Sequence, residues 1–399
     1  MIEYGSAAYK KVSFTMALGS FLIFCNLYFF QPILPQLAKE LAISATQVNW
    51  IFASTTLTLS IFLVPWALVS ESFGRKKVML IGLFSPPIIN LFMLADSSFY
   101  SMVIARACMG ISLAAFASVA VAYMAEEMSP AALTQAVGGY IAANSLGGIT
   151  GRIVGGVVTD FFSWQVAAII ISVATLIGGA VVFKNLPQQK YFKPQRGVFF
   201  HHNRQLVQHL KNKEVWFAML IGGFNFALFV NLFSVIGFRL ADEPYSLPSS
   251  LTSLTFLCYL SGTLSSRYSG RWAQKYHSIS GMVLGTMITA TGMFIAYLDD
   301  IGTMLIGLLL ISSGAFFTHA LAYGWVSQKA IRAKATATAL YLVHYYIGGS
   351  LGGFILIYCW QNGAWEAVMA GGTLFCVMIF ILCYLLKTHE LGSVKKENL

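Results

Sequence analysis

Two arginines stand inside long apolar stretches of this sequence, where a charged side chain needs a specific reason. Arg106 lies in the stretch from about residue 100 to 125, and Arg152 lies in the stretch from 128 to about 159. If these stretches cross a membrane, each arginine costs at least ~2.5 to 3.5 kcal/mol and is expected to face a polar interior. We predict that both bind substrate; the alternatives are snorkelling to the external surface and hydrogen bonding to helix carbonyls.

Two histidines, His319 and His344, lie in later apolar stretches. Imidazole changes its charge near neutral pH, as a proton-driven carrier requires, although a single histidine is often only a structural hydrogen-bonding group. No Asp or Glu occupies the middle of any apolar stretch. We therefore predict that protons are carried by His319, by His344 or by the peripheral acids Glu126 and Glu127, and that His319 also contacts substrate.

Uncharged polar side chains inside apolar stretches are further candidates for contact with a substrate. Some of them can instead tie neighbouring helices together, because such side chains hydrogen-bond across helix interfaces in membranes. The predicted substrate contacts of this kind are Asn26, Tyr28, Gln31, Asn144, Asn225 and Tyr345.

The composition indicates which elements must position these side chains. The 399 residues are 57% hydrophobic and only 10% charged, with a mean hydropathy of +0.71, whereas soluble domains carry roughly 25% charged residues. A spanning helix needs about 20 apolar residues, and twelve stretches qualify once two are extended past Arg106 and Arg152. We therefore predict an all-α integral membrane protein with twelve transmembrane helices. The stretches free of Asp, Glu, Lys and Arg are 12–38, 41–70, 78–95, 107–125, 128–151, 161–183, 215–238, 244–266, 276–298, 301–328, 335–365 and 367–386.

Some functional classes are excluded by what the sequence lacks. A membrane-embedded enzyme would need a nucleophile, an acid pair or a metal cluster at membrane depth, and an ATP-driven pump would need the phosphate loop G-x-x-x-x-G-K-S/T; none occurs. The six cysteines have no metal or redox spacing, and the adjacent His201 and His202 have no acidic or cysteine partner nearby. We predict no enzyme activity, no metal site and no cofactor.

The positions of the basic residues predict the orientation. With the amino terminus inside, 21 of the 25 lysines and arginines fall in cytoplasmic segments, while seven acidic residues fall in external turns. Such an excess of basic residues marks the cytoplasmic side, and it accounts for nearly all of the net charge of +10, so nucleic-acid binding is not expected. We predict a multi-pass protein of the bacterial cytoplasmic (inner) membrane with both termini in the cytoplasm.

A basic connector divides the apolar stretches into six and six. Residues 185–214 separate a predicted N-terminal bundle, 1–184, from a predicted C-terminal bundle, 215–399, which ends in a short cytoplasmic tail. Two six-helix pseudo-repeats are typical of secondary transporters, whose substrate site lies between the repeats near the membrane midplane. An offset of 201 residues aligns Gly147, Gly148 and Gly151 with Gly348, Gly349 and Gly352, and Trp164 with Trp365.

Residues 67–76 read A-L-V-S-E-S-F-G-R-K at the end of the second apolar stretch, and Gly110 follows Arg106 by four residues in the fourth. These patterns resemble the loop signature G-x-L-a-D-r-x-G-R-K and the fourth-span signature of the major facilitator superfamily. Residues 316–325 and 338–353 resemble the YnfM-like subgroup of bacterial inner-membrane transport proteins. The fifth stretch resembles the antiporter signature G-x8-G-x3-G-P-x2-G-G through Gly138, Gly147, Gly151, Gly155 and Gly156, with Arg152 in the place of Pro. Close helix packing is an alternative role for these glycines.

The resemblance implies a twelve-span carrier with a gated cytoplasmic side. Spans one, four, seven and ten line the cavity in this superfamily, which favours Asn26, Asn225 and His319 as substrate contacts. A charge network at the cytoplasmic ends is implied to brace the closed state, although a solvated charged loop is the alternative. The predicted gating residues are Glu71, Gly74, Arg75 and Glu127.

These observations predict a secondary active transporter that works by alternating access. The two arginines and the missing buried acids favour proton-coupled export of a small anionic or zwitterionic solute, such as a carboxylate metabolite or a siderophore. The alternatives are a broad-specificity multidrug/proton antiporter and a proton-coupled importer of an organic anion. The expected partners are the solute, protons and the lipid bilayer, and the chain is expected to be a monomer.

Overall fold

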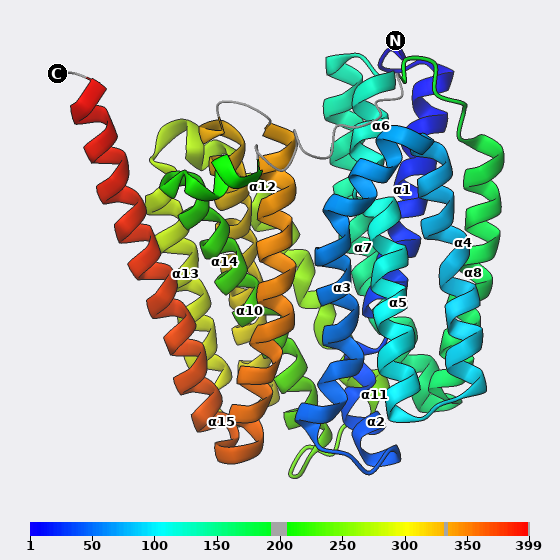
Figure 1. The fold of residues 1–399 in the computed structure, drawn as a ribbon. Coiled ribbons are helices and arrows are strands. Elements are labelled where there is room, and N and C mark those ends of the chain that lie inside the picture. Colours follow the sequence, from blue (N-terminus) through cyan, green and yellow to red (C-terminus); the bar gives the residue numbers. More distant parts are fainter. Residues whose placement is uncertain (193–205, 331–333, 398–399) are drawn as a thin grey trace. The chain divides into compact units, whose positions relative to one another are not determined.

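The computed structural model describes residues 1–192, 206–330 and 334–397, so His201 and His202 lie outside the described residues (Figure 1). The described part is all-α, with only an isolated bridge between Ile2 and Met128. The predicted fold class is therefore confirmed. The helices are α1 (Ala7–Tyr28), η1 (Gln31–Ile33), α2 (Leu34–Glu40), α3 (Ala45–Phe73), α4 (Arg75–Ala95), α5 (Phe99–Ala117), α6 (Ala120–Glu127), α7 (Pro130–Phe161), α8 (Trp164–Asn185), α10 (Lys213–Ala241), α11 (Ser249–Leu254), η2 (Thr255–Cys258), α12 (Tyr259–Lys275), α13 (Ser278–Ala296), α14 (Ile301–Lys329) and α15 (Lys334–Glu397).

The described chain divides into two compact units. Residues 1–192 and 241–254 form the N-terminal unit, and residues 206–240, 255–330 and 334–397 form the C-terminal unit. Helix α11 forms the first part of the predicted eighth span. It nevertheless belongs to the N-terminal unit, where it packs with α7 and η1. The predicted bundle boundaries at 184 and 215 remain predictions.

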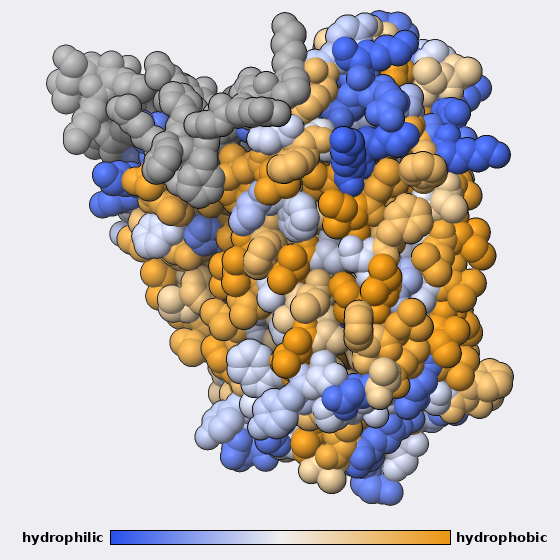
Figure 2. Space-filling view, turned by 45° about the vertical axis from the view of Figure 1, so that its right-hand side comes forward, coloured by the Kyte–Doolittle hydropathy of each residue, from blue (hydrophilic) through white to orange (hydrophobic). Residues whose placement is uncertain are grey.

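Ten helices in the described part are long and apolar enough to cross a membrane. The last of them covers two predicted spans, because Gly363 (φ −164°, ψ 25°) and Ala364 (φ 47°, ψ −147°) interrupt the helical backbone of α15. Helix α12 is rich in serine and is not among the ten. The count is consistent with twelve spans. On the face shown in Figure 2, hydrophobic residues cover the middle of the helices and hydrophilic residues gather at both ends.

The first predicted span is broken near its C-terminal end. Helix α1 ends at Tyr28, and the chain continues through η1, which contains Pro32, into α2, whose first turn contains Pro35. Proline lacks the backbone N–H that would continue the helix, and its ring clashes with the carbonyl four residues earlier. The last carbonyls of α1 are therefore left without intrahelical donors and need other partners.

Glycines allow close helix contacts in both units. On α7, a Cβ atom at Gly147, Gly151 or Gly155 would collide with the backbone of Phe21, Cys25 or Phe29 respectively. On α15, a Cβ atom at Gly348 would meet the backbone of Gly223, and one at Gly352 would meet that of Ala227 in α10. Small residues of this kind let membrane helices approach backbone to backbone. The two units thus share one packing device.

Candidate functional site

Arg152 lies at the centre of a polar cluster in the N-terminal unit. Its guanidinium carbon is 3.7 Å from the centroid of the Tyr28 ring, and its Nε donates to Gln31 Oε1 at 2.8 Å. One terminal nitrogen, NH1, donates to the Gly148 carbonyl at 2.9 Å. Only 1% of the Arg152 surface is exposed. Three of the predicted substrate contacts, from α1, η1 and α7, therefore lie together.

The local backbone explains how this cluster forms. The break after α1 places Gln31 in η1, one short turn beyond Tyr28. A Cβ atom at Gly148 would lie 3.1 Å from Arg152 NH1 and 3.4 Å from the Tyr28 ring, so a larger residue would crowd both groups. The contact with Tyr28 is a cation–π interaction, which stabilises a desolvated cation by about 2 kcal/mol.

Asn26 and Asn144 make other contacts. The Asn26 side chain donates to Leu22 O at 2.9 Å and to Thr175 Oγ1 of α8 at 2.8 Å, with no exposed surface. It thereby joins α1 to α8. Asn144 is half-buried on α7, two turns before Arg152. Their assignment as substrate contacts remains a prediction, and the hydrogen bonds of Asn26 favour helix association.

Arg106 caps the broken end of α1. Its NH1 and NH2 groups donate to the carbonyls of Asn26 at 2.9 Å and Leu27 at 2.8 Å, and its Nε donates to Ile51 O of α3 at 3.3 Å. These first two carbonyls are among those that the end of a helix leaves without intrahelical donors, and a cation near a helix C-terminus is favourable. The geometry therefore favours the carbonyl-bonded alternative for Arg106, which is completely buried.

His319 belongs to an aromatic cluster in the C-terminal unit. Its Nδ1 lies 2.9 Å from the Tyr341 hydroxyl, and its ring centroid lies 4.4 Å from that of Tyr345. Tyr345 stacks on Phe226 of α10 at 3.9 Å with an interplanar angle of 14°. Among the described residues, no hydrogen bond to His319 Nε2 is found. His319 and Tyr345 are half-buried, whereas Tyr341 is fully buried.

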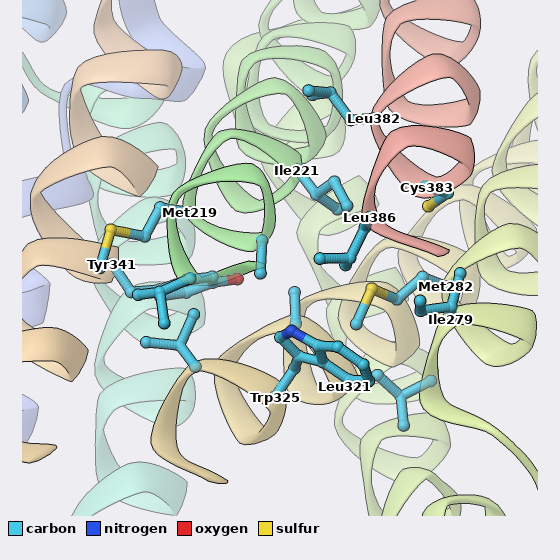
Figure 3. Close-up of a cluster of buried hydrophobic side chains, with 14 of the residues drawn as sticks. Met219, Ile221, Ile279, Met282, Leu321, Trp325, Tyr341, Leu382, Cys383 and Leu386 are labelled. Atoms are coloured by element: carbon cyan, nitrogen blue, oxygen red, sulfur yellow. The ribbon is translucent and has the colours of Figure 1, made fainter. Parts of the chain in front are cut away.

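An apolar core fixes the buried side of this cluster. Tyr341 lies in one group with Met219 and Ile221 of α10, Leu321 of α14 and Leu386 of α15 (Figure 3). Close packing of such a core holds its side chains in single rotamers. The hydroxyl that meets His319 is therefore held in position by residues that sequence analysis did not single out.

His344 and Asn225 lie apart from the His319 hydrogen bond. Nδ1 of His344 lies 2.8 Å from the Leu340 carbonyl one turn earlier in α15. Asn225 is 2% exposed, and its amide donates to Ala315 O of α14 at 3.0 Å. Both contacts are local or structural in kind, and the predicted roles of these two residues in proton and substrate binding remain untested predictions.

The predicted gating residues meet at the end of the N-terminal unit that is predicted to face the cytoplasm. Arg75 donates to Glu126 Oε1 through Nε at 3.1 Å and through NH2 at 2.8 Å, and it also bonds the Ser70 hydroxyl. Gly74 has φ +94°, a conformation that favours glycine. Glu71 is half-buried next to this turn. Arg75 of the loop signature therefore forms an ion pair with Glu126 near the end of α6, and the gating role of these residues remains a prediction.

Glu127 and Gln189 connect this network to the chain that follows α8. The Glu127 carboxylate is buried, and it accepts hydrogen bonds from the backbone N–H groups of Lys190 at 2.8 Å and Tyr191 at 3.0 Å. Gln189 accepts the Arg75 backbone N–H at 2.8 Å. Sequence analysis missed Gln189, because a single glutamine in a polar connector belongs to no pattern.

The C-terminal unit carries a different network at the equivalent ends of its helices. Lys329, the last residue of α14, bridges Glu214 of α10 at 3.2 Å and Glu390 of α15 at 3.0 Å. His277, the cap of α13, lies 2.8 Å from the other oxygen of Glu390.

Comparison with known proteins accords with this fold. Residues 16–353 match the family model described as Major Facilitator Superfamily. The chain is 29% identical over its full length to the MFS-type transporter YybF of Bacillus subtilis, covering 98% of that protein. It is 31% identical to the inner membrane transport protein YnfM of Escherichia coli, with 97% of this chain and 92% of YnfM covered.

A solved structure shows the same fold. A bacterial homolog of the human lysosomal transporter Spinster, in an inward-facing and unoccupied conformation, superposes with a TM-score of 0.77 at 13% identity, covering 96% of this chain and 97% of that one. The family match, the multi-pass helices and the loop signature agree with one another. The chain therefore belongs to the major facilitator superfamily and is a membrane transporter, not an enzyme.

Proposed function

We propose that the chain is a secondary active transporter that exports a small anionic or zwitterionic solute in exchange for protons, by alternating access. In this proposal Arg152 binds the carboxylate of the solute. Tyr28 and Gln31 orient the guanidinium, and Arg106 holds the helix break that carries them. The solute class is a carboxylate metabolite or a siderophore.

The observation that carries the proposal is the environment of the Arg152 guanidinium. Its contacts with Gln31, Gly148 and Tyr28 involve a neutral amide, a carbonyl and an aromatic face. Arg152 is only 1% exposed, so these contacts hold the guanidinium inside the unit. Arginine presents its donors in a planar fork that matches a carboxylate, so an incoming carboxylate can replace the Gln31 oxygen at Nε.

Proton coupling is assigned to His319. It is a half-buried imidazole at membrane depth, and its Nδ1 is fixed by the Tyr341 hydroxyl. Binding a proton at Nε2 would place a positive charge in the C-terminal unit. Glu126 and Glu127 are less suited to this task, because the first pairs with Arg75 and the second accepts two backbone N–H groups.

The environment and assembly of the transporter complete the proposal. Both termini lie in the cytoplasm, because the basic residues concentrate in the segments on that side of the membrane. The membrane is the bacterial cytoplasmic membrane, and the chain works as a monomer with no cofactor.

The aromatic cluster of the C-terminal unit favours a second candidate, a broad-specificity multidrug/proton antiporter. The Tyr345 ring stacks on Phe226 of α10, and the His319 ring of α14 lies against Tyr345 in a tilted arrangement. Aromatic faces attract organic cations. This candidate does not need the charge of Arg152, which separates it from the first.

Counterflow in proteoliposomes tests the proposal and separates the two candidates. Organic acids, siderophores and cationic dyes are offered at several pH values to the wild type and to Arg152→Gln. We expect pH-dependent exchange of a carboxylate that falls at least about 30-fold in the variant, since removing one partner of a buried charged contact costs about 2 to 5 kcal/mol. Dye exchange that survives Arg152→Gln would instead establish the multidrug candidate.

A further inference from the structure

The first residues after α8 lie against the gating turn between α3 and α4. Oε1 of Gln189 accepts the backbone N–H groups of Arg75 at 2.8 Å and Lys76 at 3.4 Å, and Nε2 of Gln189 donates to Glu126 Oε2 at 3.3 Å. A Cβ atom at Gly74 would lie only 3.4 Å from Gln189 Oε1. One amide thus contacts both the backbone of the turn and the carboxylate that pairs with Arg75.

The same segment is held by four more hydrogen bonds. Two of them are accepted by the carboxylate of Glu127, a residue that is only 3% exposed. A buried carboxylate without hydrogen-bond donors is strongly unfavourable, whereas charge-assisted bonds from backbone N–H groups stabilise it. The four bonds are Lys190 N to Glu127 Oε1, Tyr191 N to Glu127 Oε1, Tyr123 Oη to Pro187 O and Lys76 Nζ to Leu186 O.

These contacts join residues 186–191 to the turn and to the end of α6. The Arg75 side chain can keep both of its hydrogen bonds to Glu126 Oε1 only while the turn and the end of α6 keep their relative position. Gln189 contacts both of these elements. Its neighbour Gln188 is exposed and provides a matched position on the same segment.

We infer that Gln189 is a positioning residue of the cytoplasmic gate, which couples the connector to the Arg75–Glu126 ion pair. The inference rests on the proposed function in one respect, the alternation between states closed and open to the cytoplasm. It does not depend on the solute or on protons. Release of the connector weakens the ion pair and shifts the population towards the state that is open to the cytoplasm.

The first test measures the hydrogen bonds between Gln189 and the turn by hydrogen–deuterium exchange of the purified protein. In Gln189→Ala, the amides of Arg75 and Lys76 lose their acceptor, and we expect their exchange to accelerate at least about tenfold. Gln188→Ala should leave the same amides unchanged. Equal protection of the two amides in wild type and Gln189→Ala would contradict the inference.

The second test measures the gate by double electron–electron resonance. Spin labels replace the exposed Lys77 and Lys275 in a background without the six native cysteines. We expect Gln189→Ala to increase the population at the longer distance at least about threefold, while Gln188→Ala does not. A distribution that stays unchanged, or shifts to the shorter distance, overturns the inference.

A reciprocal exchange separates positioning from a general loss of structure. Gln189→Glu removes the amide donor and places a carboxylate beside Glu126, so it should disturb the distance distribution as Gln189→Ala does. Adding Glu126→Gln restores an amide and a carboxylate at the two positions, and we expect it to recover at least half of the change. No recovery would mean that the amide does not act through Glu126. A failed carboxylate assay with an intact Gln189 effect would refute only the solute assignment.

Discussion

The two units share a packing device but differ in what they place beside it. In the N-terminal unit, α7 meets α1 through Gly147, Gly151 and Gly155; in the C-terminal unit, α15 meets α10 through Gly348 and Gly352. The offset of 201 residues that aligns these glycines places Gly353 opposite Arg152. The N-terminal unit therefore has a buried cation where the C-terminal unit has no side chain.

The polar groups of the C-terminal unit are of another kind. They include the neutral amides of Asn225 and Asn231, which bond helix carbonyls, and the imidazole of His319 beside Tyr341. The buried Arg239 of this unit is paired with Asp299 near the end of α10. The glycine contacts recur because both units must bring two helices close together. A charge that occurs at this aligned position in only one repeat, at a cost in the membrane, indicates a task that packing does not impose. That contrast supports the assignment of anion binding to one unit and proton binding to the other.

The largest loss of stability is expected from substitutions at the glycine contacts that both units share. Gly155→Val and Gly352→Val place a side chain where the backbones of Phe29 and Ala227 lie, and backbone cannot move aside as a side chain can. We expect each to destabilise its unit by at least about 3 kcal/mol and to abolish a monodisperse, folded protein in detergent. Gly138→Ala is the control, because a Cβ atom there has nothing within 4 Å; thermal unfolding should show unchanged or slightly raised stability. If the Gly352→Val protein folds normally, the claim that both units depend on the same glycine contacts is wrong.

The next largest loss of stability is expected from removing the polar side chains that hydrogen-bond neighbouring helices, and it should differ between the two units. Arg106→Ala removes three hydrogen bonds and leaves the carbonyls of Asn26 and Leu27 buried, at an expected cost of about 3 to 5 kcal/mol. Asn231→Ala removes two bonds, to Ala227 O and Gly349 O, and should cost about 1 to 2 kcal/mol. Thermal unfolding of the two variants shows which of them is less stable. If Arg106→Ala unfolds like the wild type, the capping role of Arg106 is refuted.

A smaller effect is expected on the pH dependence of exchange. His319→Gln keeps a polar side chain next to Tyr341 but cannot gain a proton, so we expect the several-fold change of counterflow rate between pH 5.5 and 8 to flatten. His277→Gln, at the exposed cap of α13, is the control and should keep the wild-type profile. An unaltered profile in His319→Gln would remove proton coupling from the aromatic cluster.

The sequence predicted the helical class and the family because hydropathy and the loop signature are local properties of the chain. It also named Arg152, Tyr28 and Gln31, which lie together, since polar residues in apolar spans are conspicuous. For Arg106 it predicted substrate binding, with bonding to helix carbonyls as an alternative, because the helix break that exposes those carbonyls is not visible in the sequence. Gln189 was missed for a related reason, since its importance comes from a turn more than a hundred residues earlier.

The most direct measurement compares the binding of a transported carboxylate with that of its neutral amide to the purified protein. Isothermal calorimetry is performed on wild type, Arg152→Gln and Arg152→Lys in nanodiscs. The account predicts that the wild type prefers the carboxylate at least about 30-fold, that Arg152→Lys keeps part of this preference, and that Arg152→Gln loses it. An undiminished preference in a folded Arg152→Gln protein would contradict the anion site.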